Sequence, residues 1–464
     1  MKVLLAASEV APLIKLGGLG DVIGSLPKAL EKLNVNVDVI VPFFPFAKVT
    51  DLKLYKSIEL TVPFDNATHT VEVFKTKLPS SQVDVLLLRN AKYFGVSKVN
   101  PIPSKVSELE LFTFFSKAVV EYIKAEFSTY NLIHCNDWHT GLITDFLQEE
   151  FGETRPKTLF TIHNLLYQGV AGLEIVREAG IVPGENPIID SDIADGTINM
   201  MMQGIASADY VNTVSPSYAK EILSEEFGKN LYDTLKARED RLMGILNGVD
   251  YSQFPRFNDV QDSLTYKKAQ KQKLQKELGL KQSDAPLFCF ISRLDPNQKG
   301  LDLLLDAILH ILQQGGQFVL LGLGDKAWEE KFKNLETAGT KGNLAINISF
   351  DTGFANRIYE GSDFVVIPSK YEPCGLNQMI GMWYGAVPIV HAVGGLKDSI
   401  NDGVNGFTFE KYDAGELITA IDRALKVFYS DHRKLLLDNA LRADFSWDKS
   451  AKLYKNLYEQ IYIR

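Results

Sequence analysis

The chain has 464 residues, of which 45% are hydrophobic and 23% charged, and its formal net charge is −9. This composition is ordinary for a soluble globular protein, and the length suffices for two or three domains with substantial cores. No apolar stretch approaches the roughly 20 residues of a membrane-spanning helix, and the acidic balance disfavours nucleic acid as a partner. The N-terminus lacks a secretory signal pattern, and the three widely spaced cysteines favour a reducing cytoplasm over a disulfide framework or a metal cluster.

The first predicted element is a buried strand, residues 3–7, and a glycine-rich loop connects it to a helical pattern. The loop is Lys15-Leu16-Gly17-Gly18-Leu19-Gly20-Asp21. Glycine backbone lets N–H groups approach a ligand, the start of a helix adds partial positive charge, and Lys15 adds a full one. This arrangement predicts an anion site, although a tight turn between strand and helix would also explain the glycines. The spacing is not G-x-G-x-x-G, so a dinucleotide site of the usual kind is not indicated.

Short apolar runs then alternate with helical patterns along the whole chain. The predicted strands are 3–7, 37–41, 83–88, 158–162, 209–214, 287–292, 317–321, 344–348, 363–367 and 387–390. The predicted helices include 111–126, 140–150, 215–227, 265–278, 300–314 and 413–427. This alternation predicts an α/β protein with parallel sheets and helices on both faces.

The pattern occurs twice, with turn residues between 247 and 265 at the break. We therefore expect two doubly wound, Rossmann-like domains that face a central cleft. The first spans 1–248 and is joined by a C-terminal helix, 447–464, and the second spans 249–446.

Polar side chains follow two of the apolar runs in the first half. Asp137, Trp138 and two histidines lie in the run His134–His139, but no second carboxylate is close by, so a metal site is weakly supported, and a helix cap with Trp138 in the core is the alternative. His163 ends the predicted strand 158–162. It could donate a hydrogen bond to a sugar hydroxyl, or it could be a satisfied core histidine.

Cations and a carboxylate follow two predicted strands in the second half. Arg293 and Lys299 flank a strand-to-helix turn, where they could bind phosphate oxygens or could simply be solvated. Glu372 precedes Pro373 and is therefore extended, and the amides of residues 374–376 begin a helix beside it. A carboxylate and helix-start amides at one point can hold several sugar hydroxyls. The set offers no nucleophile–base pair, and it suits the departure of a phosphate leaving group from a sugar carbon.

These motifs, in this order, resemble those of bacterial glycogen synthases and plant starch synthases, which are retaining glucosyltransferases of GT-B architecture. The matching stretches cover nearly the whole chain: Ser8-Glu9-Val10 through the Lys15 loop, 134–141, 161–169, 213–216, 245–250, 292–300, 368–376 and 394–396. The resemblance implies transfer of glucose from a nucleotide sugar, usually ADP-glucose, to the non-reducing end of an α-1,4-glucan. It implies no cofactor and no metal, because cations take the place of a metal.

The resemblance also implies site residues. The expected catalytic set is His163, Glu372, Lys299 and Arg293, with His163 on the transferred glucose and the two cations on the departing diphosphate. The expected substrate-binding residues are Lys15, Gly17, Gly18, Asp137, Asn247, Phe350, Cys374, Gly375 and Leu376.

The chain departs from the family pattern at several positions. Met202 stands where the family usually has lysine, and Asn230 stands where it has glycine. Leu111 and His391 each replace an arginine, and Asn377 replaces a frequent threonine. UDP-glucose as donor, a lipid or small-molecule acceptor, and a homologue that binds glucan without catalysis therefore stay as alternatives.

Overall fold

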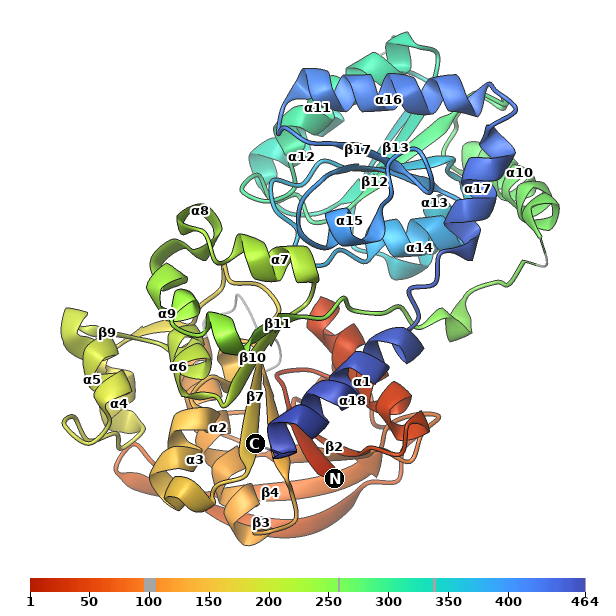
Figure 1. Cartoon of the computed structure of the whole chain (residues 1–464). Helices are drawn as coiled ribbons and strands as arrows, with labels where there is room; N and C mark the ends of the chain where they lie inside the picture. The colour runs from red at the N-terminus through yellow and green to blue at the C-terminus, as the bar shows by residue number, and fades with distance from the viewer. Residues whose placement is uncertain (96–105, 258, 337–338, 464) are drawn as a thin grey trace. The chain divides into compact units, whose positions relative to one another are not determined.

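The computed structural model describes residues 1–95, 106–257, 259–336 and 339–463. The chain forms two compact units, which Figure 1 shows. Unit 1 comprises Met1–Gly248 with Ser446–Arg464, and unit 2 comprises Val249–Phe445.

Within the described residues, unit 1 is built on a nine-stranded sheet in the order β11-β10-β7-β6-β1-β2-β5-β4-β3. Its strands are β1 (Lys2–Ala6), β2 (Asn36–Pro42), β3 (Tyr55–Phe64), β4 (Ala67–Lys77), β5 (Asp84–Arg89), β6 (Leu132–Asn136), β7 (Lys157–Ile162), β10 (Tyr210–Thr213) and β11 (Leu242–Gly244). The pairings from β11 to β5 are parallel, and β3 and β4 extend the sheet as an antiparallel hairpin. A separate short ribbon pairs β8 (Val170–Gly172) with β9 (Thr197–Asn199).

Helices cover the sheet of unit 1 because its central parallel strands are apolar on both faces. Val3, Leu4 and Leu5 of β1 have no exposed surface. The helices are α1 (Gly18–Lys32), α2 (Glu108–Ala125), α3 (Ile143–Phe151), α4 (Leu173–Glu178), α5 (Pro187–Asp192), α6 (Met200–Ser207), α7 (Pro216–Glu221), α8 (Glu225–Gly228), α9 (Tyr232–Lys236) and α18 (Trp447–Ile463).

The last helix, α18, completes unit 1 although it follows unit 2 in the sequence. Figure 1 shows it beside α1, and Lys32 Nζ of α1 lies 2.9 Å from Asp448 Oδ1 of α18. Its Tyr454 and Tyr458 are fully buried. The hydroxyl of Tyr458 lies 2.8 Å from His134 Nδ1, and Asn212 donates to the hydroxyl of Tyr454. Since buried hydroxyls require such partners, these bonds fix the position of α18 on the strands.

Unit 2 is built on a six-stranded sheet in the order β14-β13-β12-β15-β16-β17, and each pairing among these described strands is parallel. Its strands are β12 (Leu287–Ile291), β13 (Gln317–Gly322), β14 (Leu344–Ile348), β15 (Phe364–Ile367), β16 (Val387–His391) and β17 (Phe407–Phe409). Its helices are α10 (Val260–Glu277), α11 (Leu301–Gln313), α12 (Lys326–Lys333), α13 (Thr352–Gly361), α14 (Asn377–Trp383), α15 (Gly394–Ser399), α16 (Ala414–Phe428) and α17 (Arg433–Arg442).

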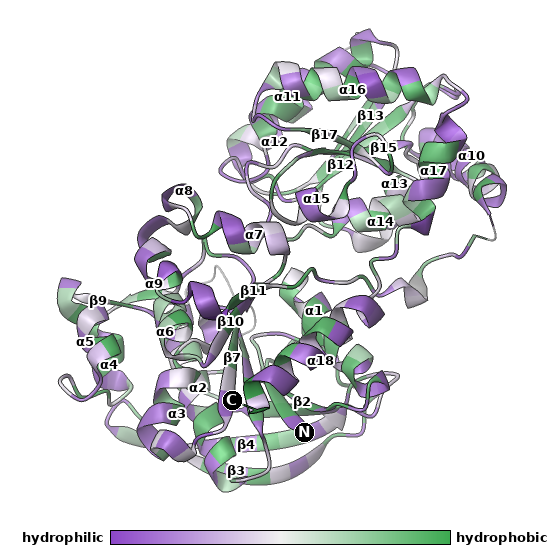
Figure 2. Cartoon of the chain, viewed as in Figure 1, coloured by the Kyte–Doolittle hydropathy of each residue, from purple (hydrophilic) through white to green (hydrophobic). Residues whose placement is uncertain are grey.

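Alternate residues of β12 enter two separate apolar clusters, one on each face of the sheet. Phe288 and Phe290 pack with residues of α11 and α16, whereas Leu287 and Cys289 pack with residues of α13 and α14. Figure 2 shows hydrophobic residues along the strands and mixed colouring on α11 and α16, which each bury an apolar side.

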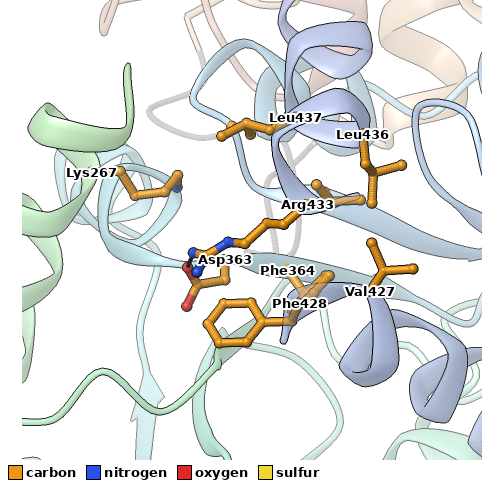
Figure 3. A pocket seen from close by; sticks show the side chains of 10 residues that line it. Lys267, Asp363, Phe364, Val427, Phe428, Arg433, Leu436 and Leu437 are labelled. Atoms are coloured by element: carbon orange, nitrogen blue, oxygen red, sulfur yellow. Dashed lines mark hydrogen bonds and ion pairs between the residues drawn. The ribbon is translucent and has the colours of Figure 1, made fainter. Parts of the chain in front are cut away.

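A charged cluster closes the amino end of the unit 2 strands. The Asp363 carboxylate, just before β15, lies 2.7 Å from Lys271 and 3.0 Å from Arg433, and it accepts a hydrogen bond from Leu287 N. Figure 3 shows Arg433 of α17 reaching Asp363 beside Phe428, at a small pocket that Lys267 also lines. Lys267 donates to the carbonyls of Tyr359, Glu360 and Ser362 at the end of α13, and burial lowers its pKa to about 8. The cluster therefore joins α10, α13 and α17 to the sheet.

The predicted α/β architecture and the ten predicted strands are confirmed, with small shifts at their ends. The helix predicted over 215–227 is wrong as a single element. It divides into α7 and α8, because the Ser224 side chain accepts from Phe227 N and starts a new helix. The β3–β4 hairpin was not predicted.

The buried His134 predicts a pH-dependent stability of unit 1. Burial lowers the pKa of His134 to about 3, below the value of about 6.5 for an exposed histidine. Between these values the unfolded chain binds a proton that the folded chain does not, so the free energy of unfolding falls as the pH drops from 6.5 toward 3. In His134→Gln this loss should be smaller, by at most about 1.4 kcal/mol per pH unit. Urea unfolding of both proteins at pH 7 and pH 5 measures the difference.

Burial raises the pKa values of Asp137 and Asp145 to about 7, so these two groups make the free energy of unfolding rise as the pH falls below 7. They are common to both proteins and cancel in the comparison. Equal pH dependence of the wild type and His134→Gln would contradict the prediction.

Candidate functional site

In each sheet two neighbouring parallel strands continue to their next parallel neighbours in opposite directions. In unit 1 these strands are β1 and β6, and in unit 2 they are β12 and β15. Open α/β sheets bind ligands in the crevice at the carboxyl ends of such strands. The glycine loop follows β1 and Asp137 follows β6, while Arg293 and Lys299 follow β12. The loop that carries Glu372 follows β15, so the topology gathers most of the predicted residues at these two points.

In the glycine loop, the backbone amides of Leu16 and Gly17 and the Lys15 ammonium group already have carboxylate partners within unit 1. Gly17 is the extended residue before α1, and its N–H donates to the Glu9 carboxylate at 2.8 Å, as does the N–H of Leu16. Lys15 Nζ lies 2.7 Å from Asp21 Oδ1, and both side chains are 41% exposed. The N–H of Gly17 therefore has a partner within unit 1, and its role as a ligand-binding amide stays a prediction. A side chain at Gly18 would meet nothing within 4 Å, so Gly18 faces open space.

The loop after β6 is strained and tied to the loop after β7. Asp137 is buried and has a φ of +61°, which a non-glycine residue rarely adopts. Its Oδ1 accepts from His163 N at 3.3 Å. Burial raises the pKa of Asp137 to about 7, although backbone N–H groups of His163, Asn164 and Trp138 counter this rise. Its carboxyl thus shapes the backbone around His163.

His163 is a neutral imidazole in a fixed orientation. Its Nε2 lies 3.0 Å from Asn136 Oδ1. Asn136 Nδ2 donates to the carbonyls of Ala6 and His134, so Oδ1 must accept from His163 and Nε2 carries the proton. Burial lowers the pKa of His163 to about 3, so the ring stays neutral at physiological pH.

The side chains of Trp138 and His139, in the run His134–His139, pack together in unit 1. Trp138 belongs to the hydrophobic core, with the His139 ring stacked on it at 4.1 Å. A Cβ at Gly169, which has a φ of +64°, would lie 2.2 Å from the Trp138 ring, so the chain after His163 rests directly on that ring. Across the described part of the chain, no group of three His, Cys, Asp or Glu side chains has the arrangement of a metal site.

Two further predicted residues lie outside these loops. Asn247, near the end of unit 1, is 5% exposed, and among the described residues nothing hydrogen-bonds to its buried Oδ1. An orphaned buried acceptor of this kind suits a ligand hydroxyl. Phe350 follows β14, at the edge of the unit 2 sheet, and is 78% exposed.

The centre of the unit 2 site is an ion pair. Lys299 Nζ lies 2.7 Å from Glu372 Oε2, and the side chains are only 12% and 11% exposed. The Ser369 hydroxyl donates to the same carboxylate oxygen at 3.0 Å. Arg293, an exposed residue of the same turn as Lys299, adds a second cation. Partial burial strengthens the attraction between the Lys299 and Glu372 charges relative to the same pair in water.

Three loops of unit 2 touch at positions where only glycine fits. A Cβ at Gly300, with a φ of +63°, would lie 1.9 Å from the Pro368 carbonyl, and one at Gly395 would lie 2.1 Å from the Cys374 carbonyl. Gly395 N also donates to the Glu372 carbonyl at 3.1 Å. The loops after β12, β15 and β16 therefore hold Lys299, Glu372 and the 374–376 amides as one assembly.

The departures from the family pattern have defined contacts. Leu111 is buried in the core of unit 1, where a charge would be costly, and the partly buried Met202 packs against that core. Asn230 exchanges hydrogen bonds with the Gln168 amide, whose oxygen also accepts from Asn199. In unit 2, His391 Nδ1 lies 2.8 Å from the Ser369 carbonyl, and Asn377 donates to the Ile291 carbonyl. Both contacts support the loops that hold Glu372 and Lys299.

Sequence reasoning missed the roles of Glu9 and Ser369. Both stand inside the recognised motifs, but their partners are a loop amide and a carboxylate that only the fold brings close. The one signal was the presence of Glu9, an acid, directly after an apolar strand and ahead of the glycine loop.

Residues 2–237 match the family described as starch synthase catalytic domain, and residues 285–427 match glycosyl transferases group 1. The chain is 39% identical to a glycogen synthase of Fervidobacterium nodosum, over 99% of each chain. It is 40% identical to a glycogen synthase of Kosmotoga olearia, over 99% of this chain and 98% of that protein.

Among solved structures, the catalytic domain of starch synthase IV from Arabidopsis thaliana, bound to ADP and acarbose, is similar with a TM-score of 0.90 and 30% identity. That match covers 100% of this chain and 99% of the other. A sucrose-phosphate synthase from Thermosynechococcus elongatus shares the fold, with a TM-score of 0.63 and 20% identity, over 100% of this chain and 99% of the other.

The fold and these matches define a glycosyltransferase of GT-B architecture. The chain belongs to the glycogen synthase and starch synthase family. Among its described residues no helix is both long and apolar enough to span a membrane.

The contact at Gly300 predicts a sharp contrast between two glycines of unit 2. Gly300 and Gly403 both have positive φ, but a Cβ at Gly403 would meet nothing within 4 Å. Gly403→Ala should cost about 1–2 kcal/mol from backbone strain alone. Gly300→Ala should lower the melting temperature further and reduce transfer activity, because the Pro368 carbonyl must move and Lys299 is the adjacent residue. Similar melting temperatures for the two variants would contradict the close approach.

Proposed function

We propose that this enzyme transfers glucose from ADP-glucose to the non-reducing end of an α-1,4-glucan, with retention of the anomeric configuration, in the cytoplasm. Two findings support the substrates: relatives named glycogen synthase align over the full length, and the similar starch synthase IV structure binds ADP and acarbose. The observation that carries the proposal is the partly buried Lys299–Glu372 pair at the switch point of unit 2.

The opposite charges of Lys299 and Glu372 match the two opposite charges that would develop in the reaction. As the bond to the diphosphate breaks, negative charge grows on the leaving phosphate and positive charge grows on the sugar ring. Lys299, with Arg293, would stabilise the first, and Glu372 would stabilise the second. Because the loops are already fixed, little reorganisation is needed when the charges appear, which is the condition for strong electrostatic catalysis.

The other residues would bind and orient the substrates. The amides of Cys374, Gly375 and Leu376 would bond to hydroxyls of the transferred glucose, and the Asn247 oxygen would accept from another hydroxyl. The exposed ring of Phe350 would offer a flat surface to the donor. The departing phosphate would accept the proton of the acceptor hydroxyl.

In unit 1 the donor would displace existing partners. Lys15 would exchange Asp21 for a donor phosphate, assisted by the amide of Gly18. The neutral His163, held by Asn136 and by the Asp137 carboxylate, would contact the transferred glucose near its anomeric carbon.

The test of this function is glucosyl transfer to glycogen with radiolabelled ADP-glucose and UDP-glucose in parallel. We expect elongation with ADP-glucose, and α-1,4 linkages in the product. Preference for UDP-glucose would revise the donor. Binding of glycogen without transfer from either donor would replace the enzyme assignment with that of a glucan-binding protein.

The ion pair predicts non-additive effects on catalysis. Lys299→Gln and Glu372→Gln should each lower kcat by about a hundredfold, as removal of one transition-state contact commonly does. Each single variant also leaves the other charge without its partner, so the double variant should lose far less than the product of the single losses. Initial rates of the four proteins at saturating substrates measure this coupling. Multiplicative losses would show that the two residues act independently.

The three cations Lys15, Arg293 and Lys299 predict metal-independent activity. They can offset the charge of a departing diphosphate without Mg²⁺, which would require carboxylate or phosphate oxygens in octahedral arrangement. Initial rates with ADP-glucose and glycogen should be the same in EDTA and in added MgCl₂. An absolute requirement for Mg²⁺ or Mn²⁺ would contradict the role given to these cations.

A further inference from the structure

A carboxylate occupies the place where the glycine loop was expected to bind an anion. The Glu9 side chain is 5% exposed. Its carboxylate accepts hydrogen bonds from the N–H groups of Leu16 and Gly17, and the N–H of Gly20 also interacts with it. Glu9 is not one of the proposed substrate-binding residues. We propose that Glu9 is a positioning residue for the donor, which holds the glycine loop in the shape that presents Lys15 and Gly18. This inference rests on the proposed function.

The loop is built around the Glu9 side chain. A Cβ at Gly20 would lie 2.7 Å from Glu9 Oε2, and a Cβ at Gly17 would lie 3.5 Å from Oε1. Gly20 therefore leaves room for the carboxylate of Glu9, whereas a Cβ at Gly17 would only be in van der Waals contact with it. At Gly18, by contrast, an added Cβ would meet nothing within 4 Å. The same loop thus has an inner side filled by Glu9 and an outer residue that faces open space.

The backbone that carries Glu9 is itself fixed. The next residue, Val10, exchanges two hydrogen bonds with Ile14, at 2.9 and 2.8 Å, and Ala11 N donates to the Gly20 carbonyl at 2.9 Å. These bonds close the chain between β1 and α1 into a rigid unit. Glu9 thus transmits the position of β1 to the start of α1.

The charge of Glu9 suits this task. A carboxylate at the amino end of a helix interacts favourably with the helix dipole, and charge-assisted hydrogen bonds to backbone N–H groups are stronger than neutral ones. The pKa of Glu9 is raised, because burial, with a small contribution from the Asp21 carboxylate, outweighs the lowering by the N–H groups of Leu16, Gly17 and Gly20. With the inner amides taken, a donor phosphate is left to Lys15 and Gly18 on the outer side.

The test is a graded series at this position, Glu9→Gln and Glu9→Ala, with Glu59→Gln on β3 as the matched control. Glu59 is an exposed acid paired with Lys56. Glutamine keeps one acceptor oxygen and loses the charge, whereas alanine loses every bond to the loop. We expect the KM for ADP-glucose and the Kd for ADP to rise about tenfold in Glu9→Ala and by less in Glu9→Gln. The KM for glycogen should stay unchanged in both, and the control should match the wild type.

Equal increases in the two KM values, or an unchanged KM for ADP-glucose in Glu9→Gln and Glu9→Ala, would overturn the inference. Circular dichroism and melting temperature identify a variant that fails to fold, and Glu9→Gln then carries the test, because it conserves the volume of the side chain. Transfer activity of the wild-type protein distinguishes failure of this inference from failure of the proposed function. If wild-type protein transfers no glucose, the proposed function fails, whereas ADP binding still tests Glu9.

Discussion

The need to cover both faces of parallel strands determines where the chemistry of this protein lies. A strand such as β1 or β12 is apolar on both sides, so the chain must return through a helix before it adds the next parallel strand. All such strands then end at the same edge of their sheet. At the point where the strand order changes direction, two neighbouring loops diverge and leave room for a ligand. The paired loops of Glu9 and Asp137 in unit 1 and of Lys299 and Glu372 in unit 2 follow from this constraint.

The strong charges at these edges are compensated within each unit. Lys15 pairs with Asp21, Glu9 with loop amides, and Lys299 with Glu372. A buried charge without a partner is costly, which explains the partners of Glu9, Lys299 and Glu372. Under the proposed function, substrate binding would exchange these partners for groups of the substrate. The formal net charge of −9 is compatible with binding of an anionic donor for this reason.

Rigid backbone surrounds these exchangeable pairs. Gly300 and Gly395 let loops touch at distances that no side chain permits, and Asp137 holds a left-handed conformation beside His163. At the other end of the unit 2 sheet, Asp363 joins Lys271 and Arg433. Unit 1 is completed by α18, whose buried Tyr458 bonds to His134 within β6. The residue that follows β6 is Asp137, so the last helix of the chain supports a strand that leads directly to the site.

Much of the fold could be predicted from local sequence, because apolar runs and helical periodicity are properties of neighbouring residues. The ten strands and the repeated α/β pattern were predicted in this way. The β3–β4 hairpin was missed although Ile58, Leu60 and Val62 alternate with polar residues, which is the pattern of a strand buried on one face. The ordered motifs also determined the family, because their spacing along the chain is specific.

Only the tertiary structure decided which partners the site residues have. Lys299 and Glu372 are 73 positions apart, and the sequence gives each a separate role until the adjacent strands β12 and β15 bring them to 2.7 Å. Gly17 is close to Glu9 in the sequence, yet the loop geometry alone shows that Glu9 takes its amide. The sequence determined which chemical groups are available and on which elements they lie. Their pairing was decided by the register of the strands and the close approach of the loops, since hydrogen bonds and ion pairs depend on distances that residue types do not encode.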